Sequence, residues 1–133
     1  NFLGATFKGR ITLSGTYYYG QLDDYPGDNM VGLYFMPDAA DAQRLPHWVQ
    51  EGTVKEIIFR NSEAFIKAVI PAKIARAVKR GKRASAQGRV AFVAEEFEAA
   101  VSCGAAIYVT RFHSIARAPK LYATRGAVER TTC

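Results

Sequence analysis

The sequence has no long apolar run and no excess of glycine or proline, and each of these absences excludes a class of protein. No apolar run approaches the roughly 20 residues that a transmembrane helix requires. With 11 glycines and five prolines in 133 residues, the chain is neither collagen-like nor of low complexity. A hydrophobic fraction of 49% argues against intrinsic disorder. We therefore expect one globular domain, 1–133, with a core that needs no metal or disulfide.

The sequence also lacks the short motifs of common enzymes. It contains no Gly-x-Ser-x-Gly, no His-Glu-x-x-His and no phosphate-binding loop, and neither His47 nor His113 lies in a recognisable motif. Two histidines and two distant cysteines are too few for a metal site. We therefore expect a protein that is not an enzyme and that has neither a cofactor nor a metal.

Charge is distributed unevenly along the chain, which has a formal net charge of +6. Residues 1–51 carry three basic and six acidic side chains, whereas residues 52–133 carry 15 basic and six acidic side chains. The positive part could attract phosphates, anionic lipid headgroups or an acidic protein. Ordinary solubility accounts for the same charge.

The first residue and the two cysteines bear on the compartment. If a leader was removed before Asn1, the protein is periplasmic or secreted; otherwise it is cytoplasmic. A disulfide between Cys103 and Cys133 would close a loop of about 30 residues and contribute roughly 3–4 kcal/mol. Alternatively, Cys103 is a small buried residue and Cys133 lies on a tail. Two free thiols, titrated under denaturing and non-reducing conditions, would exclude the bridge.

Most of the chain has the sequence pattern of β-strands. Apolar and polar residues alternate over 6–19, 82–94 and 97–112, as in strands with one buried face, and Glu95–Glu96 is predicted to form the turn between the last two. Residues 30–36 and the β-branched run 54–59 predict further strands. Between the first two strands, residues 21–29 contain many turn-forming residues and predict a loop.

Residues 62–81 admit two interpretations. Residues 64–70 are apolar and β-branched, which favours another strand, but Ser62 and the spacing after it also suit a helix to Arg80. Pro71 argues against an uninterrupted helix. Residues 72–80 carry an amphipathic pattern that ends at Gly81, which predicts one short helix. Residues 37–52 are predicted to be a helical turn or an ordered loop.

The order of these elements predicts a mainly β fold, a barrel with one short helix. It resembles the OB fold, a five- to six-stranded Greek-key barrel with a helix between strands three and four. The core would cover about 6–112, followed by a C-terminal extension, 113–133. The chain looks like the small bacterial domains of this fold that have no assigned activity. The resemblance rests on element order, because no diagnostic motif is present.

The OB resemblance implies a ligand surface on strands two and three and on the loops after strands one and four. It places Tyr34 and Met36 on that face, and Tyr18 and Tyr25 at its rim. The same rim contains Asp23, Asp24, Glu95 and Glu96. Acidic loops fit poorly with a single-stranded nucleic acid, which requires a basic groove with stacking aromatics.

A run of cations in the second half of the chain is the other candidate site. It consists of Lys73, Arg76, Lys79, Arg80, Lys82, Arg83 and Arg89. These residues could bind phosphates, but the run contains no aromatic side chain, and cations also suit the C-terminal end of a helix. A solvated helix end is the alternative to an anion-binding patch.

We therefore expect a non-enzymatic binding module that engages a protein or a small polar ligand through its loops and outer strand face. The alternative is binding of single-stranded nucleic acid or another polyanion through the cations of 73–89. A third possibility is a subunit whose apolar residues near Trp48 pack in an oligomer. The sequence identifies neither the ligand nor the oligomeric state.

Overall fold

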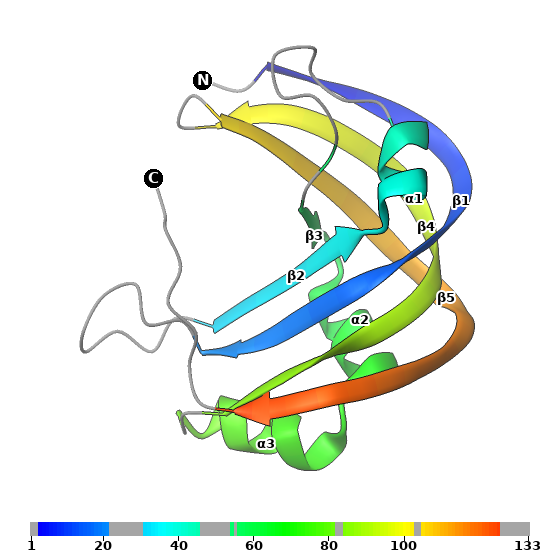
Figure 1. Cartoon of the computed structure of the whole chain (residues 1–133). Coiled ribbons are helices and arrows are strands. Elements are labelled where there is room, and N and C mark those ends of the chain that lie inside the picture. Colours follow the sequence, from blue (N-terminus) through cyan, green and yellow to red (C-terminus); the bar gives the residue numbers. More distant parts are fainter. Residues whose placement is uncertain are drawn as a thin grey trace.

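One sheet of five strands, closed into a ring, dominates the structure (Figure 1). The computed structural model describes residues 3–21, 31–45, 54, 56–81, 84–102 and 105–125. The strands are β1 (Leu3–Gln21), β2 (Val31–Pro37), β3 (Ile57–Phe59), β4 (Ser85–Ser102) and β5 (Ala105–Arg125). The described helices are α1 (Ala39–Arg44), α2 (Ser62–Val69) and α3 (Ala72–Lys79). The prediction of a mainly β fold is confirmed, with more helices than the single one predicted.

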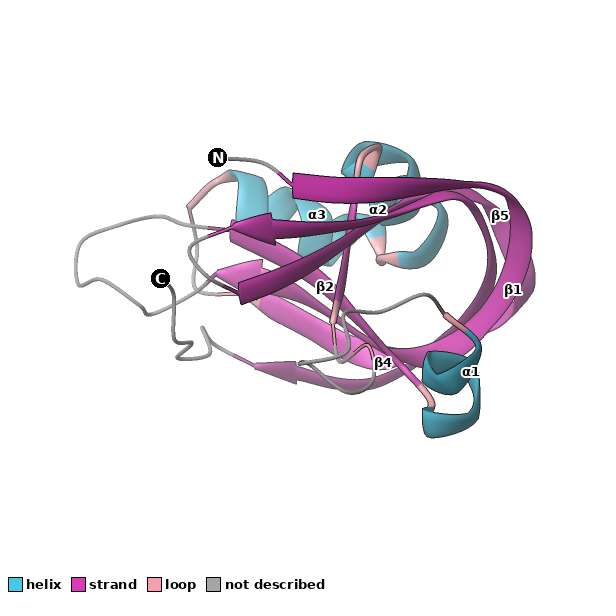
Figure 2. Cartoon of the chain, turned by 90° about the horizontal axis from the view of Figure 1, so that it is seen from above, coloured by secondary structure: helices cyan, strands magenta, loops and turns pink. Residues whose placement is uncertain are grey.

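The strands follow one another round the ring in the order β1-β2-β3-β5-β4. β1 pairs antiparallel with β2 and with β4, β2 with β3, and β4 with β5, whereas β3 and β5 are parallel. The long strands bend round one side of the ring, and α1 lies apart from α2 and α3 in both views (Figures 1 and 2). The helices therefore cover different parts of one sheet.

The close contact between β1 and β2 requires glycine at position 15. A Cβ atom there would lie 2.1 Å from the carbonyl oxygen of Met36 and 2.8 Å from the ring of Phe35. The Met36 oxygen belongs to the backbone and cannot turn aside as a side chain would. Gly15 thus allows β1 and β2 to pair, from Gly15 opposite Pro37 to Gln21 opposite Val31.

The predicted turn at Glu95–Glu96 is wrong. β4 continues through both residues, and its last pair with β5 joins Ser102 to Ala105. Glu96 has a φ of 55°, and the register of β4 shifts there against both neighbouring strands. Because β1 and β5 hold β4 on either side, the turn-like conformation of one residue produces a bulge and does not reverse the chain.

β5 is longer than the sequence predicted. It continues past Phe112 to Arg125 and pairs with the first half of β4, where Ser85 lies opposite Arg125. Much of the predicted extension 113–133 is therefore a strand of the ring. Weak alternation after Phe112, with alanines and Pro119, conceals this strand in the sequence.

The segment after β3 is helical, so the predicted strand 64–70 is wrong and the competing helix begins where expected, at Ser62. Phe65, Ile66 and Val69 form the buried side of α2. The helix ends at Val69, and the next residue, Ile70, has a ψ of 132°, the extended conformation favoured before Pro71. The predicted short helix is confirmed as α3, which is followed by Arg80 and Gly81.

Phe65 links α2 to the ring. The side chain is fully buried. Its phenyl group contacts aromatic side chains of four strands of the closed sheet. The centroid distances are 6.1 Å to Tyr17, 4.5 Å to Phe59, 6.0 Å to Phe92 and 5.5 Å to Phe112. One helical side chain thus holds β1, β3, β4 and β5 around a common centre.

We expect Phe65→Ala to lower the free energy of unfolding by about 3–5 kcal/mol, because it leaves a cavity among these rings. Urea denaturation measures the effect. Lys67→Ala, on the exposed side of the same helix, is the control and should change stability by no more than about 0.5 kcal/mol. Equal effects of the two substitutions would contradict a central role for Phe65.

Candidate functional site

Tyr34 and Met36 of the predicted ligand face lie on β2, and Tyr18 of its predicted rim lies beside them on β1, so these residues share the β1–β2 pair and not the pair of strands two and three. Tyr18 is opposite Tyr34 in the register, and Thr16 is opposite Met36. Their neighbours Tyr17, Tyr19 and Phe35 belong to the hydrophobic core, so the alternation of the strands directs this set outward. The structure therefore brings Tyr18, Tyr34 and Met36 together, whereas Tyr25 lies outside the described residues.

Both tyrosines of this face make contacts within the protein. Tyr18 is only 8% exposed, and its hydroxyl donates a hydrogen bond of 2.9 Å to the carbonyl oxygen of Gln21. Tyr34 is half-buried and lies over Gly32, where a Cβ atom would be 2.4 Å from Cε2 of the tyrosine ring. The face is therefore a packed aromatic surface with Met36 at its side.

Gln21, at the end of β1, was missed by the sequence reasoning. It is 5% exposed, and its amide Nε2 has no hydrogen-bond partner. A buried donor without a partner costs about 1–3 kcal/mol, which makes it a candidate for contact with a bound acceptor. The sequence holds no signal for this role, because Gln21 begins the run of turn-forming residues that predicts a loop.

α1 covers the edge of β1 where β2 ends. The Asp41 carboxylate accepts a 2.7 Å hydrogen bond from the Ser14 amide, and Arg44 donates to the Thr12 carbonyl oxygen at 3.1 Å. The Asp38 amide donates to the Ser14 carbonyl oxygen at 2.8 Å. Backbone and side chains of α1 thus continue the hydrogen bonding that a longer β2 would supply.

Arg89 has a different role from the other predicted anion-binding residues. It lies on β4, and its guanidinium donates two hydrogen bonds to the Asp38 carboxylate, at 2.9 and 2.5 Å. These bonds hold the pKa of Asp38 below its usual range, against the opposing effect of burial. Arg89 therefore fastens α1 to the sheet, although the sequence pattern grouped it with the cations of the helix.

The cations of α3 are exposed, as expected for either interpretation of this run. Lys73, Arg76 and Arg80 have no carboxylate partner among the described residues, and Lys79 lies 3.6 Å from Glu63 of α2. Lys82 and Arg83 lie outside the described residues. The structure thus keeps the helical part of the run together, in positions open to an anionic partner.

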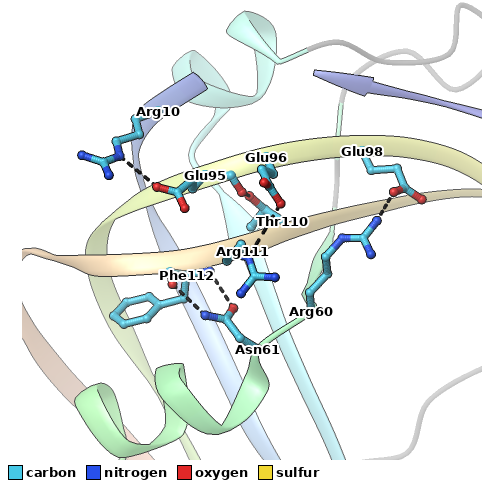
Figure 3. A network of polar contacts seen from close by, with 9 residues as sticks. All are labelled: Arg10, Arg60, Asn61, Glu95, Glu96, Glu98, Thr110, Arg111 and Phe112. Carbon is cyan, nitrogen blue, oxygen red and sulfur yellow. Dashed lines mark hydrogen bonds and ion pairs between the residues drawn. The ribbon is translucent and has the colours of Figure 1, made fainter. Parts of the chain in front are cut away.

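A network of ion pairs surrounds the bulge of β4 (Figure 3). Arg10 lies 2.9 Å from Glu95, Arg111 lies 3.7 Å from Glu96, and Arg60 pairs with Glu98. The fully buried Thr110 donates a 3.1 Å hydrogen bond to the Glu95 carbonyl oxygen. The glutamates thus neutralise arginines of the barrel, and the threonine satisfies the backbone at the bulge.

A cavity of about 140 Å³ lies between this bulge and the end of α1. Ile11, Leu45, Ala94 and Phe97 supply its apolar lining, and the charged lining residues are Lys8, Arg10, Arg44, Glu95 and Glu96. A cavity of this size suits a few water molecules or a small ring. The arginines beside it are already bonded to carboxylates or backbone, which leaves Lys8 as its most available polar group.

His113 is the one histidine among the described residues. It is exposed, and its Nδ1 lies 2.8 Å from the Ser114 hydroxyl oxygen. His47, Cys103 and Cys133 lie outside the described residues, so the predicted disulfide stays a prediction. Within the described ranges, no three potential metal ligands cluster, and no helix has the length and apolar character needed to span a bilayer.

Comparisons of the chain with models of protein families, with curated protein sequences and with solved structures gave no match.

The Asp38–Arg89 pair predicts a specific pH dependence. Because the pKa of Asp38 is lowered by folding, the pair stabilises the fold above the unfolded-state pKa, near 4, and this contribution is lost as the pH falls through the folded-state value. The side chains are 40% and 37% exposed, so we expect Asp38→Asn to cost about 0.5–1 kcal/mol at pH 7.

Denaturation of both proteins at pH 7 and at about pH 2 tests this prediction, since the difference between them should vanish in acid. Glu63→Gln, which breaks a longer and more exposed ion pair, is the control and should have a smaller effect at pH 7. An Asp38→Asn effect that persists at low pH would show that packing, and not charge, is responsible.

Proposed function

We propose that the protein is a non-enzymatic binding module built on an OB-type Greek-key barrel. Support for the fold comes from the strand order β1-β2-β3-β5-β4, the parallel β3–β5 pair and the helices between β3 and β4. Proteins of this fold bind ligands across strands two and three and the adjoining loops. The proposal of a binding role follows from this general property of the fold and from the sequence, in which we find no catalytic motif; the surface proposed here lies on the neighbouring strand pair, β1 and β2.

The binding surface in this proposal is the outer face of β1 and β2, formed by Tyr18, Tyr34 and Met36. The observation that carries it is their convergence on one side of a single strand pair. Tyrosine offers a flat apolar ring with a polar tip, and methionine adapts its shape to a partner. This combination of polar tips and apolar surface suits a protein segment or a small polar molecule as the ligand.

Two variants that each introduce one arginine test this surface. Met36→Arg should weaken ligand binding at least about tenfold, because a long charged side chain would cover the tyrosine pair. Thr12→Arg places the same charge at an exposed position of β1 away from the pair and should leave binding unchanged. The readout is amide NMR titration of each protein with a panel of peptides and oligosaccharides.

In the wild-type protein, the amide signals of Tyr18, Tyr34 and Met36 should shift on binding. Signals that move only elsewhere, or binding that survives Met36→Arg, would contradict the proposed face. Thermal unfolding of each variant shows whether a loss of binding reflects a loss of structure.

A second candidate function is binding of single-stranded nucleic acid or another polyanion through the cations of 73–89. It is favoured by the exposure of Lys73, Arg76 and Arg80 without carboxylate partners among the described residues. Its site is narrower than the sequence suggested, because Arg89 is bonded to Asp38.

Fluorescence anisotropy of a labelled single-stranded oligonucleotide at low salt tests the nucleic-acid form of this candidate. Binding through these cations should weaken with salt, with a slope of about 0.7 for each phosphate contact. Lys73→Gln with Arg76→Gln should reduce both the affinity and that slope. Constant anisotropy up to high micromolar protein would exclude single-stranded nucleic acid as the partner.

A further inference from the structure

The exposed side of the two helices after β3 carries almost only positive charge. We call the residues Lys67, Lys73, Arg76, Lys79 and Arg80 the basic helical face. All five are exposed, and Glu63 is the one carboxylate on α2 and α3. The opposite sides of the helices, with Phe65, Ile66, Val69 and Val78, are buried against the barrel. The basic helical face therefore points away from the core.

The ion pair between Glu63 and Lys79 defines how the two helices lie. Glu63 is in the first turn of α2 and Lys79 in the last turn of α3, and their side chains approach to 3.6 Å. The start of α2 and the end of α3 therefore lie close together, and on α3 the spacing of Lys73, Arg76 and Arg80 places their side chains on one surface. That surface lies at the other end of the ring from α1 (Figure 1).

The charge of this face is not balanced by the rest of the described protein. Five arginines elsewhere are each paired with a carboxylate: Arg10 with Glu95, Arg44 with Asp41, Arg60 with Glu98, Arg89 with Asp38, and Arg111 with Glu96. These pairs occupy most of the described carboxylates. The basic helical face is thus a positive patch whose cations, apart from Lys79, have no carboxylate partner among the described residues.

The residues between the cations indicate the kind of partner. The other exposed positions of α2 and α3, apart from Glu63, are Ala64, Ala68 and Ala72. Small side chains allow close approach to a broad surface, but they neither stack on bases nor insert into acyl chains. The large apolar residues of both helices are directed into the barrel. The contact available to this face is therefore electrostatic and superficial.

We propose that the basic helical face docks the protein on a bilayer surface rich in anionic lipid headgroups, without insertion. The inference uses the same cations as the second candidate function and is independent of the tyrosine face. Each cation near an anionic membrane strengthens binding by roughly fivefold, and the attraction is screened by salt. At the other end of the ring, α1 keeps its own contacts with β1 and is not required for docking.

Co-sedimentation with vesicles tests the proposal, with phosphatidylcholine alone or mixed with about one-third phosphatidylglycerol. The full chain should bind the mixed vesicles at low salt, fail to bind phosphatidylcholine and dissociate as salt rises. Lys73→Gln with Arg76→Gln should weaken binding by roughly 25- to 30-fold. Lys8→Gln with Arg117→Gln removes the same net charge elsewhere and should weaken it far less.

Absence of binding to the mixed vesicles at low salt, or equal losses in the two double variants, would overturn the proposal. So would binding of a single- or double-stranded oligonucleotide through the same cations without vesicle binding, which would assign the face to nucleic acid. NMR titration of the Met36→Arg variant tests the tyrosine face separately. A negative result with vesicles therefore does not count against ligand binding at the tyrosine face, and a negative NMR result does not count against membrane docking.

Discussion

The closure of the sheet depends on β3, a strand of only three residues. β3 pairs with β2 at one position, where Ile57 lies opposite Phe35. All three residues of β3 pair in parallel with Tyr108–Thr110 of β5. The antiparallel pairs formed by β4 with β1 and β5 are far longer and would form an open sheet without it. Phe59 of β3 lies against Phe65, so burial of aromatic rings holds a short strand in place where hydrogen bonds are few. The position of α2, and with it the basic helical face, follows from this contact.

The chain uses its charges in two different ways. On the barrel and α1, arginines and carboxylates bind one another, covering the bulge of β4 and the edge of β1. On α2 and α3, cations stand with a single carboxylate between them. The sequence showed a basic second half but could not separate these uses. Arg76 and Arg89 belong to the same run of cations, and only the fold shows that Arg89 lies within hydrogen-bonding distance of Asp38. Among the described residues, α2 and α3 therefore carry a group of exposed cations, whereas the arginines of α1 and of the bulge are paired with carboxylates.

Local patterns predicted the strands whose two faces differ in environment, since alternation in β1 and β2 records one buried and one outer side. They also predicted α3, with Pro71 before it and Gly81 after it. They failed where the neighbours of a segment decide its conformation. Glu95 and Glu96 have the local pattern of a turn, but β1 and β5 pair with β4 on either side and keep it extended. Residues 64–70 have the local pattern of a strand, but Phe65 packs among aromatic side chains of four strands as part of a helix. The alternation of the sequence correctly placed Tyr18, Tyr34 and Met36 on the outer side of their strands. The burial of the Gln21 side-chain amide depends on packing that no local pattern records.

Two close approaches to glycine set different limits on how this sequence can diverge. At Gly15 the obstructing atom is a backbone oxygen, so a larger residue there has no compensating substitution at any other position. At Gly32 the obstruction is the ring of Tyr34, which a second substitution could remove. In a lineage of related chains, Gly15 would stay fixed as long as this strand pairing is kept. A larger residue at position 32 would require a smaller one at position 34, and this joint change would rebuild the outer face of β1 and β2.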